Sequence, residues 1–235
     1  MKKFILLTAL VLSCANVFAT WSIIIIDSRT KEIGIAGASC TYSCYGIGRI
    51  VPNVGAIVVQ AMSNSDARER GIQLMLAEAS PEQIIKALRD SIFDPERQQY
   101  AVITIRHINE PATYTGLLTN TFKGTLTAEG VCVQGNTLTS ETELKVIMDA
   151  VQKGKNESLS IADILMMALE AGSLAGGDRR CGEQRATSAF LTVAKPGDRH
   201  PSIDLQIFGQ GKGKQNAVTL LKIKFEKWKK RKNSK

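Results

Sequence analysis

Thr20 is the residue whose position offers the most direct route to catalysis. Lys2 and Lys3 precede an apolar run, and Val17-Phe18-Ala19 has the small-x-small form after which signal peptidase cuts. A cut there would make Thr20 the first residue. Its α-amine, with a reference pKa of about 7.7 to 8.0, could then take the proton of its own hydroxyl. The sequence thus predicts a nucleophile for acyl transfer.

Other familiar catalytic patterns are missing from the chain. There is no Gly-x-Ser-x-Gly elbow, Walker phosphate loop, His-Glu-x-x-His helix or dinucleotide fingerprint. Of the two histidines, His107 ends a predicted strand and His200 lies in a Gly/Pro loop, so neither is placed to act as a base. The alternative for Thr20 is that it merely begins a strand, as β-branched residues often do.

The leader predicts export to the periplasm or the exterior. Its apolar run is too short to span a bilayer comfortably. A second cut is possible, because Val11-Leu12-Ser13-Cys14 loosely resembles a lipoprotein signal that would anchor the chain at Cys14. Leu12 is uncommon at its place in that signal, so we favour the cut after Ala19.

Export places the cysteines in an oxidising compartment. Cys40, Cys44, Cys132 and Cys181 could form two bridges by any of three connectivities, and the sequence does not choose among them. Their spacing is not that of paired Cys-x-x-Cys knuckles, so we predict no metal site and no cofactor.

Positive charge is concentrated at the C-terminus. The formal net charge is +8, and residues 222–235 hold eight Lys or Arg against one Glu. Val218, Leu221, Phe225 and Trp228 follow near-helical spacing there, which predicts a basic amphipathic helix. It could touch an anionic envelope surface or be a solvated terminal helix. We predict no nucleic-acid partner, and a homo-oligomer remains open.

Strand blocks and helix pairs alternate along the chain. Apolar or alternating runs predict strands at 21–27, 32–39, 55–61, 100–106, 113–118, 123–126, 130–134, 186–193 and 203–208. Helices are expected at 66–78, after Ser80 with Ile84, Ile85, Leu88 and Ile92 facing inward, after Ser140 with Glu143, and after Ser160 with Asp163.

This order predicts an α+β fold in which two packed sheets carry helices on their outer faces, a four-layer αββα sandwich. We divide the chain into a signal peptide at 1–19, one domain at 20–215 and a basic C-terminal helix or tail at 216–235.

Several short motifs together resemble one family, the Ntn-hydrolase-like group catalogued as domain of unknown function 1028. They are Thr20-Trp21-Ser22-Ile23, Ala38-Ser39, Val51-Pro52, Gln60-Ala61-Met62-Ser63-Asn64, Gln134-Gly135-Asn136 and Gly176-Gly177-Asp178-Arg179-Arg180. The chain departs from the family at Ser65, where Pro is usual, and at Cys181, which precedes Gly182. The resemblance implies an Ntn-hydrolase fold and an N-terminal threonine acting on an amide.

Candidate roles follow for the residues of these motifs. Asn136 could donate to a developing oxyanion, or simply form a turn. Asp178 could orient the α-ammonium group and Arg179 could bind a substrate carboxylate, unless they form a surface pair. Ser39 and Asn64 could line the same pocket, although Asn64 could equally cap the following helix.

We therefore expect a hydrolase that acts on a small-molecule or peptide amide, including cell-wall-type amides, with Thr20, Asn136 and Asp178 as catalytic residues. The alternative is a non-catalytic envelope binding protein of the same fold. It would hold an anionic polymer through the basic tail and Arg179-Arg180.

Overall fold

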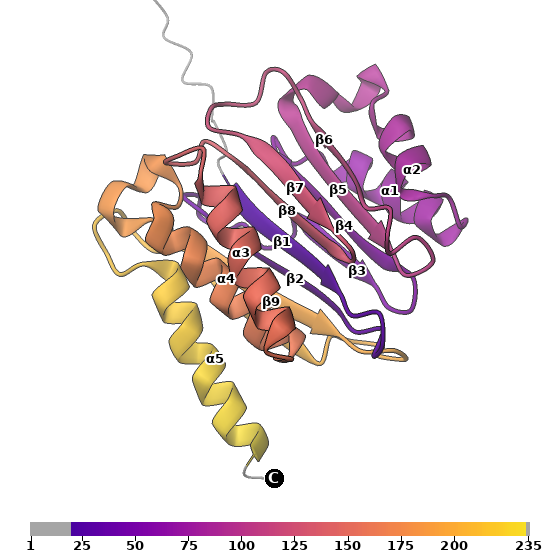
Figure 1. The fold of residues 1–235 in the computed structure, drawn as a ribbon. Coiled ribbons are helices and arrows are strands. Elements are labelled where there is room, and N and C mark those ends of the chain that lie inside the picture. Colours follow the sequence, from indigo (N-terminus) through magenta and orange to yellow (C-terminus); the bar gives the residue numbers. More distant parts are fainter. Residues whose placement is uncertain (1–19, 234–235) are drawn as a thin grey trace, which may run out of the picture.

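The computed structural model describes residues 20–233. The predicted signal peptide at 1–19 and the lipoprotein cysteine Cys14 lie outside the described residues. The fold is mixed α+β, with two antiparallel sheets and helices against them (Figure 1). Within residues 20–233, no helix is long and apolar enough to cross a membrane.

The larger sheet has Thr20 at the start of an inner strand. Its six strands lie in the order β10-β9-β2-β1-β8-β7. They are β10 (Ile203–Ile207), β9 (Ser188–Ala194), β2 (Ile33–Ser39), β1 (Thr20–Ile26), β8 (Val131–Asn136) and β7 (Gly124–Ala128). All strand pairs in this sheet are antiparallel. Because β1 lies between β2 and β8, it is hydrogen-bonded on both edges.

The smaller sheet faces the larger one across an apolar layer. Its strands are β3 (Gly48–Val51), β4 (Gly55–Ala61), β5 (Gln98–Thr104) and β6 (Ala112–Thr115), in that order. Alternate residues of both sheets, such as Ile24, Ile35, Val58 and Ala101, form one buried cluster. This alternation follows from the two-residue period of a strand.

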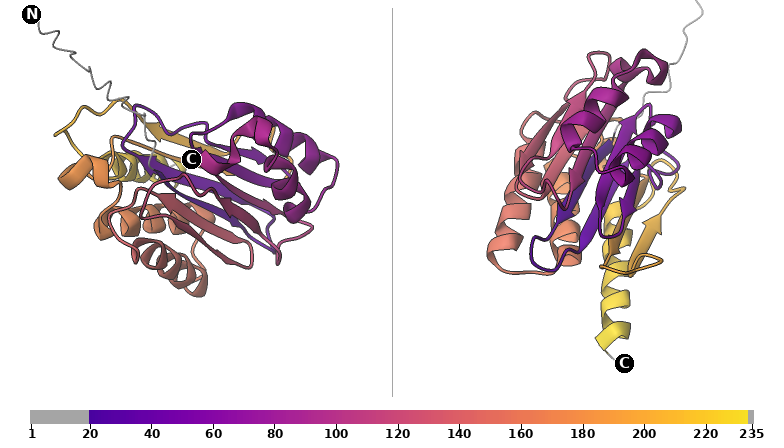
Figure 2. Two further views of the ribbon diagram at one scale, coloured as in Figure 1. Left: turned by 90° about the horizontal axis from the view of Figure 1, so that it is seen from above. Right: turned by 90° about the vertical axis from the view of Figure 1, so that its right-hand side faces the viewer.

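Helices α1 (Ser65–Leu76) and α2 (Pro81–Leu88) cover the outer face of the four-stranded sheet, followed by the short 3-10 turns η1 (Ser91–Phe93) and η2 (Pro95–Arg97). Helices α3 (Glu143–Asn156), α4 (Ile161–Ala175) and α5 (Ala217–Asn233) pack on the six-stranded sheet. A third 3-10 segment, η3 (Arg179–Gln184), follows α4. Figure 2 shows the two sheets edge-on between these helices.

The basic C-terminal helix is joined to the core by its apolar residues. Val218, Leu221 and Phe225 are buried in the cluster shared with α4 and the sheet, and Trp228 packs against it. The last turn carries Lys230, Arg231 and Lys232, and this end of α5 extends past the sheet (Figure 1).

Most predicted elements lie within three residues of the observed ones, and the Ser80 capping box and the Ser160 cap are confirmed. The prediction missed the short strand β3. It was wrong about Ile92, because α2 ends at Leu88 and the chain turns into η1, which leaves Ile92 75% exposed.

The predicted cap of α3 was also wrong. Thr142 is the N-cap and makes no side-chain cap hydrogen bond, whereas Ser140 bonds the Thr142 hydroxyl. Glu143, expected to complete that cap, is fully buried.

One disulfide is present among the described residues, between Cys40 and Cys181. Cys44 and Cys132 are free thiols buried in the layer between the sheets. Burial raises the pKa of both thiols, that of Cys44 to about 12, which keeps them protonated at neutral pH. The described structure therefore has one bridge where the sequence allowed two.

Packing of α4 on the six-stranded sheet gives a test of this core. Leu165 is fully buried there, whereas Leu174 on the same helix is 87% exposed. Leu165→Ala should lower the free energy of unfolding by about 2–5 kcal/mol, because it leaves a cavity. Leu174→Ala should change it by less than about 0.5 kcal/mol. Urea unfolding of both variants measures the difference, and equal effects would contradict this packing.

Candidate functional site

The layer between the sheets changes from apolar to polar along the strands. In β1, the side chains of Ile26 and Ile24 belong to the apolar cluster, and two residues earlier Ser22 occupies the same face. The same change occurs in β4 at Gln60, in β5 at Gln99 and in β8 at Gln134 and Asn136. All five side chains are at most 1% exposed.

These side chains form hydrogen bonds to one another, both within the smaller sheet and between the two sheets. The Ser22 hydroxyl donates to Gln60 Oε1 at 2.6 Å, and Gln60 Nε2 donates to Gln99 Oε1 at 2.9 Å. Asn136 Nδ2 donates to the same Gln99 oxygen at 2.9 Å. Gln99 Nε2 in turn donates to the Gly135 carbonyl at 2.9 Å. We call Ser22, Gln60, Gln99 and Asn136 the intersheet network.

Gln134 stands beside this network without a partner of its own. Neither its amide oxygen nor its amide nitrogen bonds any described residue. Its strand position is paired with Ser22 on β1. A buried polar group left unpaired costs about 1–3 kcal/mol. A hydrogen bond from a water molecule or a ligand at the polar end of the layer would offset that cost.

Thr20 lies at the rim of this polar end. It is paired with Ser39 on β2 and with Asn136 on β8, and its carbonyl accepts a hydrogen bond from Gln60 Nε2 at 3.2 Å. The residue is only 3% exposed, yet it lines a cavity of about 280 Å³. We call this the Thr20 cavity. Its walls are Thr20, Thr41, Ser43, Cys44, Tyr45, Gly46, Ile47, Ala61, Met62, Ser63 and Arg68.

Three residues near Thr20 have a strained backbone conformation. Ala61 ends β4 with a φ of 68°, Ser63 has a φ of 52°, and Thr137, which follows Asn136, has a φ of 53°. Non-glycine residues rarely adopt this left-handed region, and each instance costs of the order of 1–3 kcal/mol. Ala61 and Ser63 line the Thr20 cavity, so the strained segment forms part of its wall.

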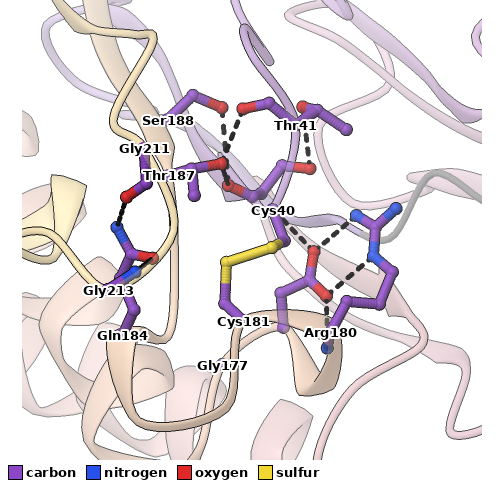
Figure 3. Close-up of a disulfide and its surroundings, with 12 residues drawn as sticks. Cys40, Thr41, Gly177, Arg180, Cys181, Gln184, Thr187, Ser188, Gly211 and Gly213 are labelled. Carbon is purple, nitrogen blue, oxygen red and sulfur yellow. Dashed lines mark hydrogen bonds and ion pairs between the residues drawn. A yellow bond between two sulfur atoms is a disulfide. The ribbon is translucent and has the colours of Figure 1, made fainter.

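Asp178 holds the loop after β2 to the segment that begins η3. Its buried carboxylate accepts from the Cys40 amide at 2.6 Å and forms an ion pair with Arg180 at 2.6 Å. The disulfide to Cys181 joins the same two segments, and Gln184 nearby bonds Gly211 and Gly213 (Figure 3). Cys40 follows Ser39, the strand partner of Thr20, so these contacts fix one wall of the site.

The other residues predicted for the site, Ser39, Asn64 and Arg179, have different surroundings. Ser39 is fully buried and accepts from the Thr41 hydroxyl at 3.1 Å. Asn64 caps α1, accepting from the amides of Asp66 and Ala67. Arg179 is exposed and lines a separate open cavity of about 330 Å³ together with Arg180. The structure therefore places Thr20, Ser39 and Asn136 side by side on adjacent strands. Asp178 contacts the loop that follows Ser39.

Glu143, the first residue of α3, is a buried acid next to Thr139. One of its oxygens accepts from the Thr139 amide at 3.4 Å, and the other bonds no described residue. Burial and the negative charge of Asp178 outweigh the hydrogen bond from the Thr139 amide and raise the pKa of Glu143 to about 8. The carboxyl group is therefore largely protonated at neutral pH.

Several residues of the site had no role predicted from the sequence. Ser22, Gln60, Gln99 and Gln134 are polar residues at inward positions of otherwise apolar strands, a signal that was present in the sequence. Arg68 carried no such signal. In the described part of the chain, no group of three or more His, Cys, Asp or Glu side chains could hold a metal ion.

The family of the chain follows from comparison with known proteins. A model described as a family of unknown function, DUF1028, matches residues 20–213. The chain belongs to this family, which confirms that part of the resemblance seen in the motifs. No curated protein matches the chain.

A solved structure supports the fold. The crystal structure of protein SPO2555 from Silicibacter pomeroyi, assigned to DUF1028, is similar with a TM-score of 0.73 at 24% sequence identity. The match covers 89% of this chain and 88% of that one. At this identity the likeness establishes the fold alone.

The buried acid gives a prediction for stability against pH. The folded protein keeps the Glu143 proton up to a pKa of about 8, whereas the unfolded chain releases it near about 4.3. The free energy of unfolding should therefore decline between these values, by at most about 1.4 kcal/mol per pH unit. Glu143→Gln should remove this contribution and become more stabilising, relative to the unmodified protein, from pH 5 to pH 9.

Urea unfolding at pH 5, 7 and 9 measures this change. Glu141→Gln is the matched control, because Glu141 is exposed two residues earlier. The same pH dependence in both variants would show that Glu143 ionises normally in the folded protein.

Proposed function

We propose that this chain is an N-terminal-nucleophile hydrolase acting on amide bonds, and that its two sheets with their outer helices are the αββα sandwich of that class. The position of Thr20 supports this most directly. It begins an inner strand, stands at the polar end of the layer between the sheets and lines a cavity. An N-terminal nucleophile requires a free α-amine and space for a substrate beside its hydroxyl, and this position can supply both once residues 1–19 are removed.

The mechanism begins once residues 1–19 have been removed. The neutral α-amine of Thr20 takes the hydroxyl proton while Oγ1 attacks the amide carbonyl. The tetrahedral intermediate collapses as the resulting ammonium group gives a proton to the leaving amine. Water, deprotonated by the same amine, then attacks the acyl ester, releases the acid and restores the threonine hydroxyl. Nucleophile and base thus belong to one residue.

Asn136 is the proposed side-chain donor to the oxyanion. An amide carries two N–H groups, and the contacts among the described residues occupy one of them, the bond to Gln99. That bond fixes the orientation of the amide next to Thr20. A preorganised donor of this kind stabilises the charge that develops in the transition state, typically by about 3–4 kcal/mol.

Asp178 acts in this proposal as a positioning residue. Its carboxylate is held by the Cys40 amide and by Arg180, so it orients the loop that follows Ser39. Arg180, rather than Arg179, is its ionic partner. Arg179 stays exposed, where it could meet a substrate group that extends beyond the Thr20 cavity.

The compartment and partners are part of the same proposal. We infer export to the periplasm or beyond, with small-molecule or peptide amides as substrates. The exposed basic end of α5 offers contact with an anionic envelope surface. The disulfide between Cys40 and Cys181 is compatible with an oxidising compartment.

The proposed mechanism requires a defined N-terminus. We predict that the protein purified from the cell envelope begins at Thr20 with a free amine, as measured by intact mass and N-terminal sequencing. A lipid-modified Cys14 start would place Thr20 inside the chain and favour the non-catalytic binding protein.

Substitution of the nucleophile tests catalysis itself. On an amide substrate found by screening, Thr20→Ala should lower kcat at least about 10³-fold, because no hydroxyl remains to form the acyl ester. Thr20→Ser should retain part of the activity. Thr219→Ala, at an exposed position on α5, serves as the control and should leave kcat unchanged. Undiminished hydrolysis by Thr20→Ala would refute the mechanism.

A further inference from the structure

Arg68 is the charged side chain among the described residues that line the Thr20 cavity. The other residues that line the cavity in the described chain are neutral hydroxyl, thiol, glycine or apolar residues. Arg68 extends from the first turn of α1, directly after the strained Ala61–Ser63 segment. It is half-buried, so part of its hydration is lost.

Arg68 has no ionic partner within residues 20–233. The ion pairs of the described chain satisfy other arginines, such as Arg106 with Glu78 and Arg180 with Asp178. None involves Arg68. Burial lowers its pKa, the positive charge of Arg49 lowers it further, and Glu69 acts in the opposite direction. Two arginines thus produce a positive potential at this wall.

The shape of the charged group narrows the choice of ligand. A guanidinium presents its donors as a planar fork that matches the two oxygens of a carboxylate. Because half-burial has already removed part of its water, a carboxylate placed there meets a stronger field than at the surface. Tyr45 and Met62, which are 44% and 42% exposed, add apolar surface to the same cavity.

We propose that Arg68 selects amide substrates that carry a free carboxylate a few bonds from the scissile carbonyl. This inference rests on the proposed function, because it assumes that Thr20 attacks a substrate in this cavity. Arg68 acts in substrate binding and Thr20 in the chemical step. The substrate class is then an amide of a dicarboxylic acid, such as a succinyl or glutaryl amide, cleaved to the free diacid and an amine.

The hydrolysis test uses pairs of substrates that differ only in charge. These are the mono-4-nitroanilides of succinic and glutaric acids and the analogues in which a carboxamide replaces the free carboxylate. The purified protein should prefer the acids by at least about tenfold in kcat/KM. Arg68→Gln should abolish this preference. Arg70→Gln, which changes an exposed arginine on the same helix, should preserve it.

A binding test separates this inference from the proposed function. Succinate and glutarate are titrated into the protein and its two arginine variants by calorimetry, with thermal unfolding confirming that each variant is folded. Binding that Arg68→Gln weakens at least about tenfold and Arg70→Gln leaves unchanged supports the carboxylate site. Absent binding, or equal binding to both variants, overturns it.

The two tests can fail independently. Hydrolysis of the anilides without preference for the acids overturns the role of Arg68 while leaving the nucleophile in place. Binding that depends on Arg68 with no hydrolysis of any anilide supports the carboxylate site and contradicts the proposed function.

Discussion

The constraint on which the site depends is the need to satisfy buried amides between two sheets. Gln60 and Gln99 come from the smaller sheet, Ser22 and Asn136 from the larger. The Ser22–Gln60 and Asn136–Gln99 bonds cross the layer, and the Gln60–Gln99 bond links them within the smaller sheet. Slipping any strand by one residue would turn its polar side chain to the opposite face. The network therefore fixes how the sheets face each other, and it does so at the end where Thr20 begins β1.

A second set of contacts fixes the loops around that end. Asp178 lies 138 residues from Cys40 in the sequence, yet its carboxylate accepts the Cys40 amide and pairs with Arg180. The disulfide joins Cys40 to the same segment. A buried ion pair is costly to break because one charge would remain unpaired. The disulfide and the ion pair together hold Ser39, the strand partner of Thr20, in place without using any group of the proposed nucleophile.

Much of the fold could be predicted because it is local. The two-residue period of β1 and the cap residues Ser80 and Ser160 act over a few positions, and the elements they predict are present. The site was harder, because its contacts join distant segments. Glu143 looked like a helix cap but is buried beside Thr139. For Asn64 the sequence left a pocket role and a helix cap open, and the structure shows the cap of α1. In the sequence, Arg68 looks like any surface arginine of a helix. Only the fold places it in the wall of the Thr20 cavity.

On the proposed mechanism, this rigid site is assembled before it can act. While Ala19 is attached, the nitrogen of Thr20 belongs to a peptide bond, and an amide nitrogen has no basic lone pair with which to take a proton. The hydroxyl, the network and the cavity require only the strands, whereas the base requires cleavage of the leader. Activity would then begin where the leader is removed, so that the step that exports the chain also creates its catalytic base.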